Sequence, residues 1–398
     1  MRQSRLYKLF SLIPIGIIML LFNQCVEPYM PELEANDAED LLVVEGKITN
    51  ETGPFRIHLT STVPVYDYQN IQSNSRPVSG AEVQIVDDKG NVYLLYENNT
   101  GWYETEDKEL KGIPGNSYTL LITTPDGIEY QSSPELMEEG PEIDRIHYQE
   151  IKRTHFDLET PYEENWLNIL VDAKVPDEEV TYFKWDFEET WEFDMPGYVL
   201  VDQGSDEGDP PPSWESIEID PEKKHCWVTE SSSSILIKST VDDPANEVRS
   251  FILQTIGPQH DRLNIKYSIL VKQHVISRDF YNYFKRIREA NEETGGIYEK
   301  TPAQILGNIQ CCDGDENALG YFMASTVRTK RIFIHPNDHN VSDGSAFGGC
   351  GWTTKPSRYF TFYQYGTYDG GSTNVYSSNI YCTDCRVRGD DVAPDFWE

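Results

Sequence analysis

The stretch Ala81-Glu-Val-Gln-Ile-Val-Asp-Asp-Lys-Gly-Asn-Val-Tyr-Leu-Leu-Tyr96 decides the fold class of this chain. Apolar and polar residues alternate over residues 81–86, which is the period of a strand with one buried face. Residues 87–91 contain aspartate, glycine and asparagine, which favour turns, and residues 92–96 are rich in β-branched and aromatic side chains. The stretch therefore predicts two strands joined by a tight turn.

The same pattern continues on both sides of this stretch. Further strands are predicted at residues 42–48, 55–59, 101–103 and 118–122, with a turn at 125–127. Short strands spaced by turns, without a helical period, favour a β-sandwich domain over residues 41–137. The motifs in Pro77–Val83, Gly101–Tyr103 and Gly112–Tyr118 resemble transthyretin-like and carboxypeptidase-regulatory sandwiches, and this resemblance implies a scaffold or spacer.

A second, larger β-rich domain is predicted over residues 143–398, after a proline-bearing linker at residues 134–141. Its predicted strands cover residues 168–175, 181–187, 234–238, 248–256, 263–276, 321–327 and 330–335. Residues 202–222 are acidic, contain no basic residue and include three consecutive prolines, which predicts an exposed loop. Beyond residue 335 the chain is irregular and rich in cysteine, so we expect a cysteine-stapled C-terminal region.

One amphipathic helix is predicted over residues 278–294. Ser277 is a suitable N-cap, and Asp279 lies in the first turn, where a negative charge opposes the helix dipole. Apolar side chains recur every three or four residues from Phe280 to Ala290, which gives the helix one apolar face. Two glycines follow and predict its end.

Residues 1–24 have the composition of a lipoprotein signal peptide. Basic residues precede the apolar run Leu9–Phe22, which is too short for a comfortable membrane span. Cys25 follows, at the position where bacterial lipoproteins are cleaved and acylated, and more than one acyl chain is needed for stable anchoring. Residues 25–40 would then be the lipidated cysteine and an acidic tether. The alternatives are a secreted protein with an incidental cysteine and an uncleaved signal anchor.

The charge of the chain limits its partners. The 398 residues carry a formal net charge of −34. So acidic a surface argues against nucleic acid, which needs a basic footprint. It would also repel anionic lipid headgroups, so the lipid anchor rather than the folded surface would attach the protein to a membrane. The charge favours solubility, and the binding of divalent cations or of a basic partner is the alternative.

Six cysteines beyond Cys25 are disulfide candidates: Cys226, Cys311, Cys312, Cys350, Cys382 and Cys385. An exported chain meets an oxidising compartment, so disulfides are expected, but six cysteines allow fifteen pairings and the sequence does not choose among them. The CxxC spacing of Cys382 and Cys385 also occurs in zinc and redox sites. Its place near the C-terminus favours a structural disulfide.

A weak calcium candidate lies at Asp313, Asp315 and Asn317, which copy the first half of a calcium-binding loop. The match then fails, because Ala318 stands where glycine is required and Ala324 where the bidentate glutamate is required. We therefore expect no cofactor, with calcium at these three residues as the one candidate.

No hydrolase elbow, zinc-peptidase motif or nucleotide-binding loop occurs in the sequence. His335 and His339 are four residues apart, but a proline, an asparagine and an aspartate between them predict a turn rather than a zinc-binding helix. We therefore predict that the protein is not an enzyme.

Several motifs, taken in order, resemble one family. They are Leu42–Asn50, Pro77–Val83, Tyr182–Trp185, Glu189–Trp191, the helix with Gly295-Gly-Ile297, Gly307–Ile309, Leu319–Phe322, Cys382–Arg386 and Asp395–Trp397. Over most of the chain after Cys25, this set is similar to the Bacteroidota outer-membrane lipoproteins that carry domain of unknown function 4249. The adjacent pair Cys311-Cys312 does not belong to that pattern, so no disulfide pairing is carried over.

The resemblance implies an exported protein, lipid-anchored (palmitate or a similar acyl chain) in the outer membrane and exposed on the cell surface. Such proteins are often encoded beside TonB-dependent transporters. We expect a non-enzymatic accessory subunit, for substrate capture or assembly, that works with a TonB-dependent β-barrel transporter. The alternatives are a stand-alone surface adhesin that binds glycans or proteins, and a hydrolase with an unrecognised pair of acids.

Overall fold

The computed structural model describes residues 41–62, 75–157, 160–175, 180–195, 198–202, 214–218, 224–241, 243, 245–258, 260–293, 305–312, 314, 317–342, 362–368, 373–377 and 384–397. The chain divides into two compact units, and all of these residues belong to the second, Leu41–Glu398. The fold is mainly β, as the sequence predicts.

One part of this unit is a closed, barrel-like sheet of nine strands. Their order is β1 (Leu42–Thr49), β2 (Arg56–Thr62), β6 (Trp102–Thr105), β5 (Val92–Asn99), β4 (Glu82–Asp87), β7 (Ser117–Thr123), β8 (Glu129–Ser132), β19 (Leu306–Cys311) and β20 (Asn317–Ile334), which returns to β1. Short strands β3 (Ser75–Pro77) and β9 (Glu135–Leu136) pair with β2 and β7. The predicted hairpin at residues 81–96 is confirmed as β4 and β5, with Gly90 at φ 85° in its turn.

The closed sheet corrects the expectation of a transthyretin-like sandwich over residues 41–137. Its last two strands come from residues 306–334, far along the chain. β20 runs parallel to β1, with Leu42 opposite Ala318 and Thr49 opposite Ser325, and β19 pairs with β8. Local periodicity reveals a strand but not a distant partner, so the sequence could not show that the sheet closes.

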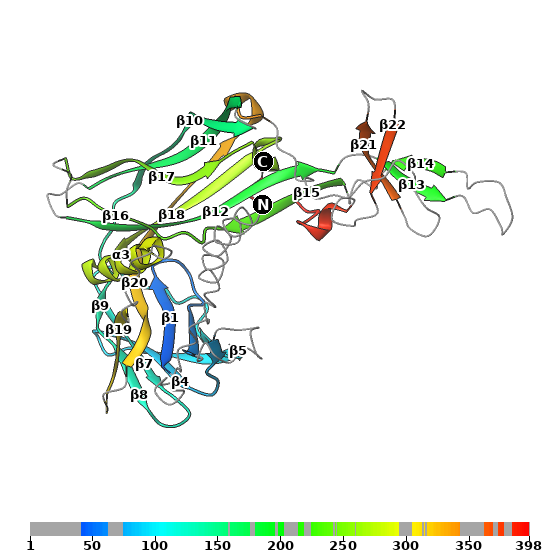
Figure 1. Ribbon diagram of the computed structural model, residues 1–398. Coiled ribbons are helices and arrows are strands. Elements are labelled where there is room, and N and C mark those ends of the chain that lie inside the picture. The colour runs from blue at the N-terminus through cyan, green and yellow to red at the C-terminus, as the bar shows by residue number, and fades with distance from the viewer. Residues whose placement is uncertain are drawn as a thin grey trace, which may run out of the picture. The chain divides into compact units, whose positions relative to one another are not determined.

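β20 continues beyond the closed sheet and becomes part of a second layer (Figure 1). Its second half pairs with β18 (Tyr267–Ile276), which is followed in the sheet by β12 (Tyr182–Asp194) and β15 (His225–Ser231), with β16 (Leu236–Ser239) also on β12. The prediction of two strands at 321–327 and 330–335 was wrong here. The polar residues Arg328 and Thr329 suggest a break, but both pair with β18 and the strand is continuous.

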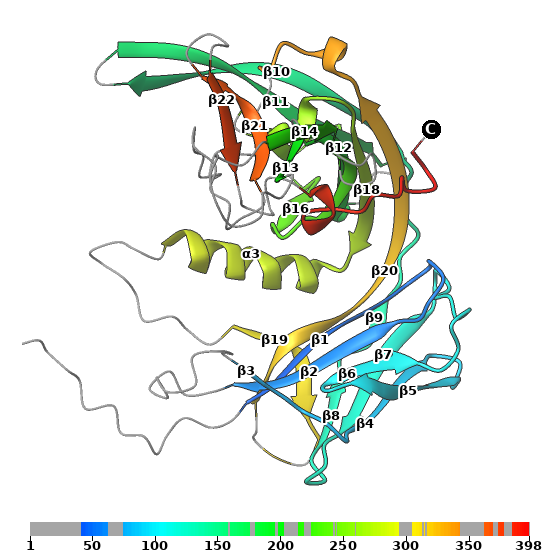
Figure 2. The same ribbon diagram turned by 90° about the vertical axis from the view of Figure 1, so that its right-hand side faces the viewer.

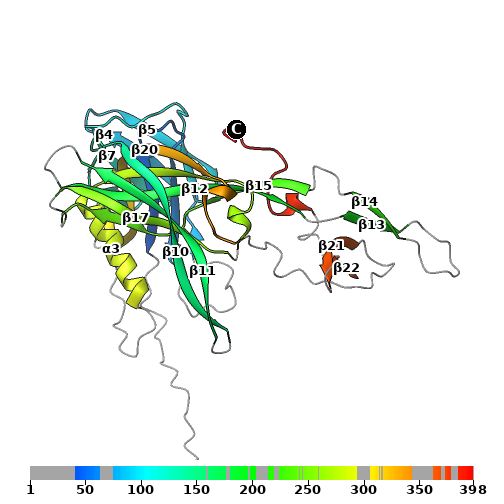
Figure 3. The ribbon, with the colours of Figure 1, turned by 90° about the horizontal axis from the view of Figure 1, so that it is seen from above.

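A separate three-stranded sheet covers one face of this layer (Figure 3). It contains β10 (Ile143–Asp157), β11 (Thr160–Lys174) and β17 (Glu247–Ile256). Between the sheets lies an aromatic and aliphatic core in which Trp185 is fully buried. The Trp185 ring lies 4.8 Å from that of Phe251, and its Nε1 donates to Gln273 Oε1 at 3.1 Å. This core contains most of the apolar area that stabilises the second layer.

The predicted helix is confirmed as α3, Arg278–Glu293. The Ser277 hydroxyl accepts a hydrogen bond from the Phe280 amide at 3.2 Å, as an N-cap does. The apolar face of α3 packs on Ile276, Tyr321 and neighbouring side chains, between the closed sheet and strands β12, β16 and β18 (Figure 2). Within the part of the chain that the structure describes, no helix is long and apolar enough to cross a membrane.

Four further strands form a sheet of their own: β13 (Tyr198–Asp202), β14 (Trp214–Glu218), β21 (Phe362–Tyr368) and β22 (Thr373–Ser377), in the order β14-β13-β21-β22. The expectation of one exposed loop over residues 202–222 is therefore wrong for residues 214–218. Short 3-10 turns are present at η2 (Asp261–Leu263), η3 (Pro336–Asp338) and η6 (Cys385–Val387).

Two glycines allow the closed sheet to close. Gly320 has φ 93°, and a Cβ added there would lie 1.9 Å from the Val44 carbonyl oxygen. A Cβ on Gly307 would lie 1.5 Å from the Gly320 carbonyl oxygen. Beside them the register of β19 shifts, and the Asn308 side chain replaces the missing backbone bonds by pairing with both the amide and the carbonyl of Phe322, at 3.0 and 2.9 Å.

We expect Gly320→Ala to destabilise the protein by about 2–5 kcal/mol. The positive φ costs roughly 1–2 kcal/mol for any L side chain, and the clash with β1 adds about 1–3 kcal/mol. Gly90→Ala is the matched control, since Gly90 also has a positive φ but nothing lies within 4 Å of its added Cβ. Urea unfolding of both variants measures the difference, and equal losses would contradict the close packing of β20 on β1.

Candidate functional site

The outer face of the second layer brings together a serine, a histidine and an aspartate from three strands. His274 on β18 lies between them, with Nε2 3.2 Å from Asp186 Oδ2 on β12 and Nδ1 3.0 Å from Ser325 Oγ on β20. Since a carboxylate only accepts, the neutral imidazole carries its proton on Nε2 and accepts the Ser325 hydroxyl at Nδ1. These three side chain types invite comparison with a hydrolase triad.

The arrangement is the reverse of a hydrolase triad. In such triads serine faces Nε2 and the carboxylate faces Nδ1, and the serine opens to the substrate. Here Ser325 is 0% exposed, and the end that reaches solvent is Asp186, whose side chain is 27% exposed. Ser325 therefore presents no nucleophile, and the serine–histidine pair fixes the position of the imidazole behind Asp186.

Lysines surround the exposed end of this row. The Lys184 ammonium contacts Asp186 Oδ1, and Lys47 Nζ on β1 lies 3.9 Å from Asp186 Oδ2. Burial alone would raise the pKa of Asp186, but the contacts with His274 and Lys184 hold this pKa well below its usual range. Burial lowers the pKa of His274 below its ordinary value despite the neighbouring carboxylate. The row thus pairs an ionised aspartate with a neutral histidine.

A second buried carboxyl group joins α3 to the closed sheet. Glu135 on β9 accepts hydrogen bonds from the Tyr321 hydroxyl at 2.7 Å and the Asn308 amide at 3.1 Å. Burial raises the pKa of Glu135, because its neighbours are neutral donors rather than cations. Tyr321 also packs against Phe280 of α3, so this polar contact fixes the first turn of the helix to β20.

A third buried carboxyl group lies on the core face of β12. Glu189 is 3% exposed and accepts from the Tyr267 hydroxyl at 2.8 Å, while Arg262 approaches it at 3.2 Å. Arg262 also binds Glu230 at 2.8 Å and covers the Trp191 ring. Burial raises the pKa of Glu189 although Arg262 opposes this. Glu189 and Tyr267 are buried in the core, and Arg262 connects them to the exposed Glu230, so the cluster presents no carboxyl group in a solvent-accessible site.

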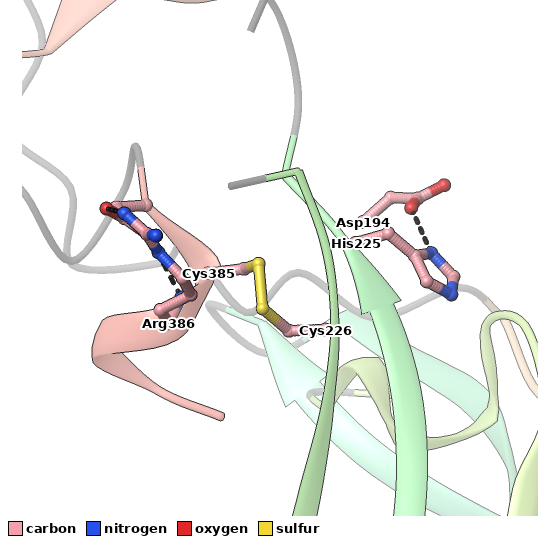
Figure 4. The surroundings of a disulfide bond; sticks show 6 residues. Asp194, His225, Cys226, Cys385 and Arg386 are labelled. Atoms are coloured by element: carbon pink, nitrogen blue, oxygen red, sulfur yellow. Dashed lines mark hydrogen bonds and ion pairs between the residues drawn. A yellow bond between two sulfur atoms is a disulfide. The ribbon is translucent and has the colours of Figure 1, made fainter. Parts of the chain in front are cut away.

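The expected disulfide bond is confirmed, and it joins Cys226 on β15 to Cys385 at the start of η6 (Figure 4). The two Cα atoms are 5.6 Å apart and both residues are fully buried. The sequence left every pairing open. Cys385 pairs outside its CxxC motif, so the two cysteines of that motif are not joined to each other.

The disulfide belongs to a C-terminal segment that is fastened along the second layer. Asp390 forms a β-bridge with Trp227, and Trp397 Nε1 donates to Glu192 Oε2 at 3.1 Å. The Phe396 ring lies 3.4 Å from the guanidinium carbon of Arg331. These contacts give a structural role to residues of the last two sequence motifs, around Cys385 and at Asp395–Trp397.

The structure places the remaining predicted site residues as follows. The predicted signal peptide and tether lie outside the described residues. The same holds for five predicted site residues: Cys25, Asp313, Asp315, Cys350 and Cys382. Cys311 is half-buried in β19 and forms no disulfide, Cys312 follows it and is exposed, and Asn317 begins β20.

The predicted turn between His335 and His339 is confirmed. His335 precedes η3, and its amide donates to Asp338 Oδ2 at 2.8 Å. Among the residues that can be described, no three His, Cys, Asp or Glu side chains are grouped to hold a metal ion.

Sequence reasoning missed Asp186, His274 and Ser325. They lie on three strands and are separated by long stretches of chain, so no spacing in the sequence connects them. One signal was present in the sequence. The charged residues Lys184 and Asp186 alternate with aromatic residues in this strand, which indicates that its outward face is charged.

We expect the stability contribution of His274 to fall as the pH drops from about 7 to about 5. The folded pKa lies below the unfolded one, so the unfolded chain binds more protons in this window and stability decreases with falling pH. Relative to His274→Gln, the wild-type protein should lose up to about 1.4 kcal/mol per pH unit. Urea unfolding across this pH range measures the difference.

His260→Gln is the control, because His260 is exposed and caps no helix with its side chain. This variant provides the baseline for replacing an exposed histidine with glutamine. A difference between the wild type and His274→Gln that does not change with pH would contradict a neutral, buried His274.

We expect peptide mapping without reduction to recover the peptide with Cys226 linked to the peptide with Cys385. Reduction should release both, and Cys385→Ser should lose about 2–5 kcal/mol of stability, since a long loop is no longer closed. Cys311→Ser is the control, because Cys311 forms no disulfide. A peptide linking Cys382 to Cys385 would contradict the observed pairing.

Comparison with known proteins gives one family. The search of curated proteins finds no match. Among solved structures, the chain is similar to a DUF4785 family protein from Legionella pneumophila subsp. pneumophila str. Philadelphia 1, at 8% identity over 59% of this chain and 52% of that chain. The TM-score is 0.14, and the chain spans about half the length of that structure, so this likeness supports no conclusion on fold or function. The model of the domain of unknown function DUF4249 matches residues 26–331, well over half of the chain, so the protein belongs to the DUF4249 family.

Proposed function

We propose that this protein is a non-enzymatic, lipid-anchored protein of the outer membrane that serves a TonB-dependent β-barrel transporter as a substrate-capture or assembly subunit. The observation that carries the proposal is the N-terminal sequence. A basic start, the apolar run Leu9–Phe22 and then Cys25 are what acylation and membrane anchoring require. Membership of the DUF4249 family agrees with the resemblance on which the transporter partnership rests.

A long hairpin supports a role in contacting another protein. β10 and β11 pair along their whole length, but β17 joins them only at residues 167–174 of β11. The outer half of the hairpin is therefore two-stranded among the described residues, and such a ribbon is marginally stable by itself. Near its tip Phe156 is 72% exposed and Tyr162 is 45% exposed. Exposed aromatic side chains on a projecting element are typical of contact surfaces.

The buried Ser325 agrees with a role other than hydrolysis, since the row formed by Ser325, His274 and Asp186 offers no reachable hydroxyl. The acidic surface agrees with a membrane attachment that depends on the lipid rather than on the folded domains.

We expect a mild-detergent pull-down of natively expressed protein to recover a TonB-dependent barrel in stoichiometric amount. Phe156→Ala should reduce this recovery by about tenfold or more, because buried aromatic anchors carry much of the energy of an interface. Mass spectrometry of the recovered proteins makes the measurement.

Val392→Ala is the matched control, since Val392 is also 72% exposed but lies in the C-terminal segment. It should leave the recovery of the barrel unchanged. Recovery of the lipoprotein alone would contradict the proposal, and glycan binding by that isolated protein would favour a stand-alone adhesin.

A further inference from the structure

Three lysines gather around Asp186 on the outer face of the second layer. Lys184 contacts the carboxylate directly, and Lys47 reaches it from β1 of the closed sheet. Lys272 on β18 is the cross-strand partner of Asp186, so both side chains stand on the same face of the sheet. Residues from two layers therefore meet at one point, next to the place where β20 passes from one layer to the other.

The charges of this group are not balanced. Lys47 and Lys184 share the Asp186 carboxylate, and no ion pair or hydrogen bond joins the nearby Lys272 to a described residue. Burial lowers the pKa of Lys47, and the positive charges of Lys184 and Lys272 lower it further, whereas the carboxylates of Asp186 and Glu51 raise it. In a chain with a net charge of −34, a local excess of positive charge is unusual, and like charges held together cost free energy unless an anion joins them.

A buried side chain also faces this group from within the sheet. His274 is 1% exposed, and its Nε2 lies 3.2 Å from Asp186 Oδ2. Its other nitrogen is occupied by Ser325. The imidazole therefore holds Asp186 from behind, and the lysines occupy the side that reaches solvent, where the Lys47 side chain is 52% exposed.

We propose that Lys47, Lys184 and Lys272 bind the phosphate group of a small anionic ligand, with Asp186 holding the ammonium groups together in its absence. The cluster contains lysines and no arginine. Arginine suits planar carboxylates because it binds them with two parallel hydrogen bonds, whereas ammonium groups act as point charges and suit the oxygens of a phosphate on several sides. A dianionic phosphate would offset the excess positive charge.

Isothermal titration calorimetry of the full-length protein with inorganic phosphate, at low ionic strength, tests this proposal. We expect saturable binding to one site. The double variant Lys47→Gln/Lys272→Gln should weaken binding at least about tenfold, since hydrogen bonds to charged groups each contribute more than one factor of ten. Lys272→Gln alone, which removes one ammonium group of the cluster, should show a smaller loss in the same direction.

Two further variants separate a site from general charge effects. Lys152→Gln/Lys285→Gln changes the net charge equally but removes exposed lysines on the β10–β11 hairpin and on α3, each near its own carboxylate. It should bind phosphate as the wild type does. Asp186→Asn removes the competing carboxylate and should strengthen binding, provided that circular dichroism shows an unchanged fold. A purely structural lysine cluster would not give this increase.

The source of the phosphate group is distinguished by a second probe. A Cys25→Ser form, which lacks the acylation site, is mixed with phosphatidylglycerol or phosphatidylcholine vesicles and floated. Binding of phosphate in solution supports a soluble ligand, and flotation with phosphatidylglycerol alone that the double lysine variant abolishes supports a lipid headgroup. The proposal is overturned if neither probe binds, or if the control double variant loses as much affinity as the site variant.

Discussion

The closed sheet and the second layer both depend on the double pairing of β20. Over residues 318–325 it is the parallel neighbour of β1, and over residues 326–334 it is the antiparallel neighbour of β18. A strand can bend and twist gradually, but its hydrogen bonds point to both sides along its whole length, so each half must find a partner. The closed sheet and the second layer are thus parts of one hydrogen-bonded system. Gly307 and Gly320 are small where the backbones meet most closely.

Burial favours the protonated form of a carboxyl group, but the neighbours of each group decide whether its pKa is finally raised or lowered. Burial raises the pKa of Glu135 and Glu189, which have too few cationic neighbours to offset it. Asp186 is also partly buried, but lysines and His274 reverse the effect. Among these three groups, the fold therefore shifts the pKa of Glu135 and Glu189 upward and that of Asp186 downward. Only the last faces outward, which is why the chemistry of the outer face centres on it.

Local signals predicted the elements of this fold well, and distant contacts not at all. The hairpin at 81–96 and the helix after Ser277 were predictable, because alternation, turn residues and capping are encoded in neighbouring residues. The closure of the sheet was not predictable, because no residue near Leu42 indicates that Ala318 will pair with it. The lysine cluster could not be predicted for the same reason. Lys47, Lys184 and Lys272 belong to three different strands, and only the strand order of the folded sheet brings them close together.

The late position of β19 and β20 has a consequence for the order of folding. Ribosomes release the N-terminal strands first, yet β1 and β8 keep open edges until residues 306–334 have emerged. Unpaired edges of this kind invite pairing with other chains, and contacts between distant residues form slowly. The growing chain is therefore exposed to aggregation until its final quarter, which begins near β19, has emerged. A truncated product that ends before β19 would leave those edges permanently open and would be prone to aggregation.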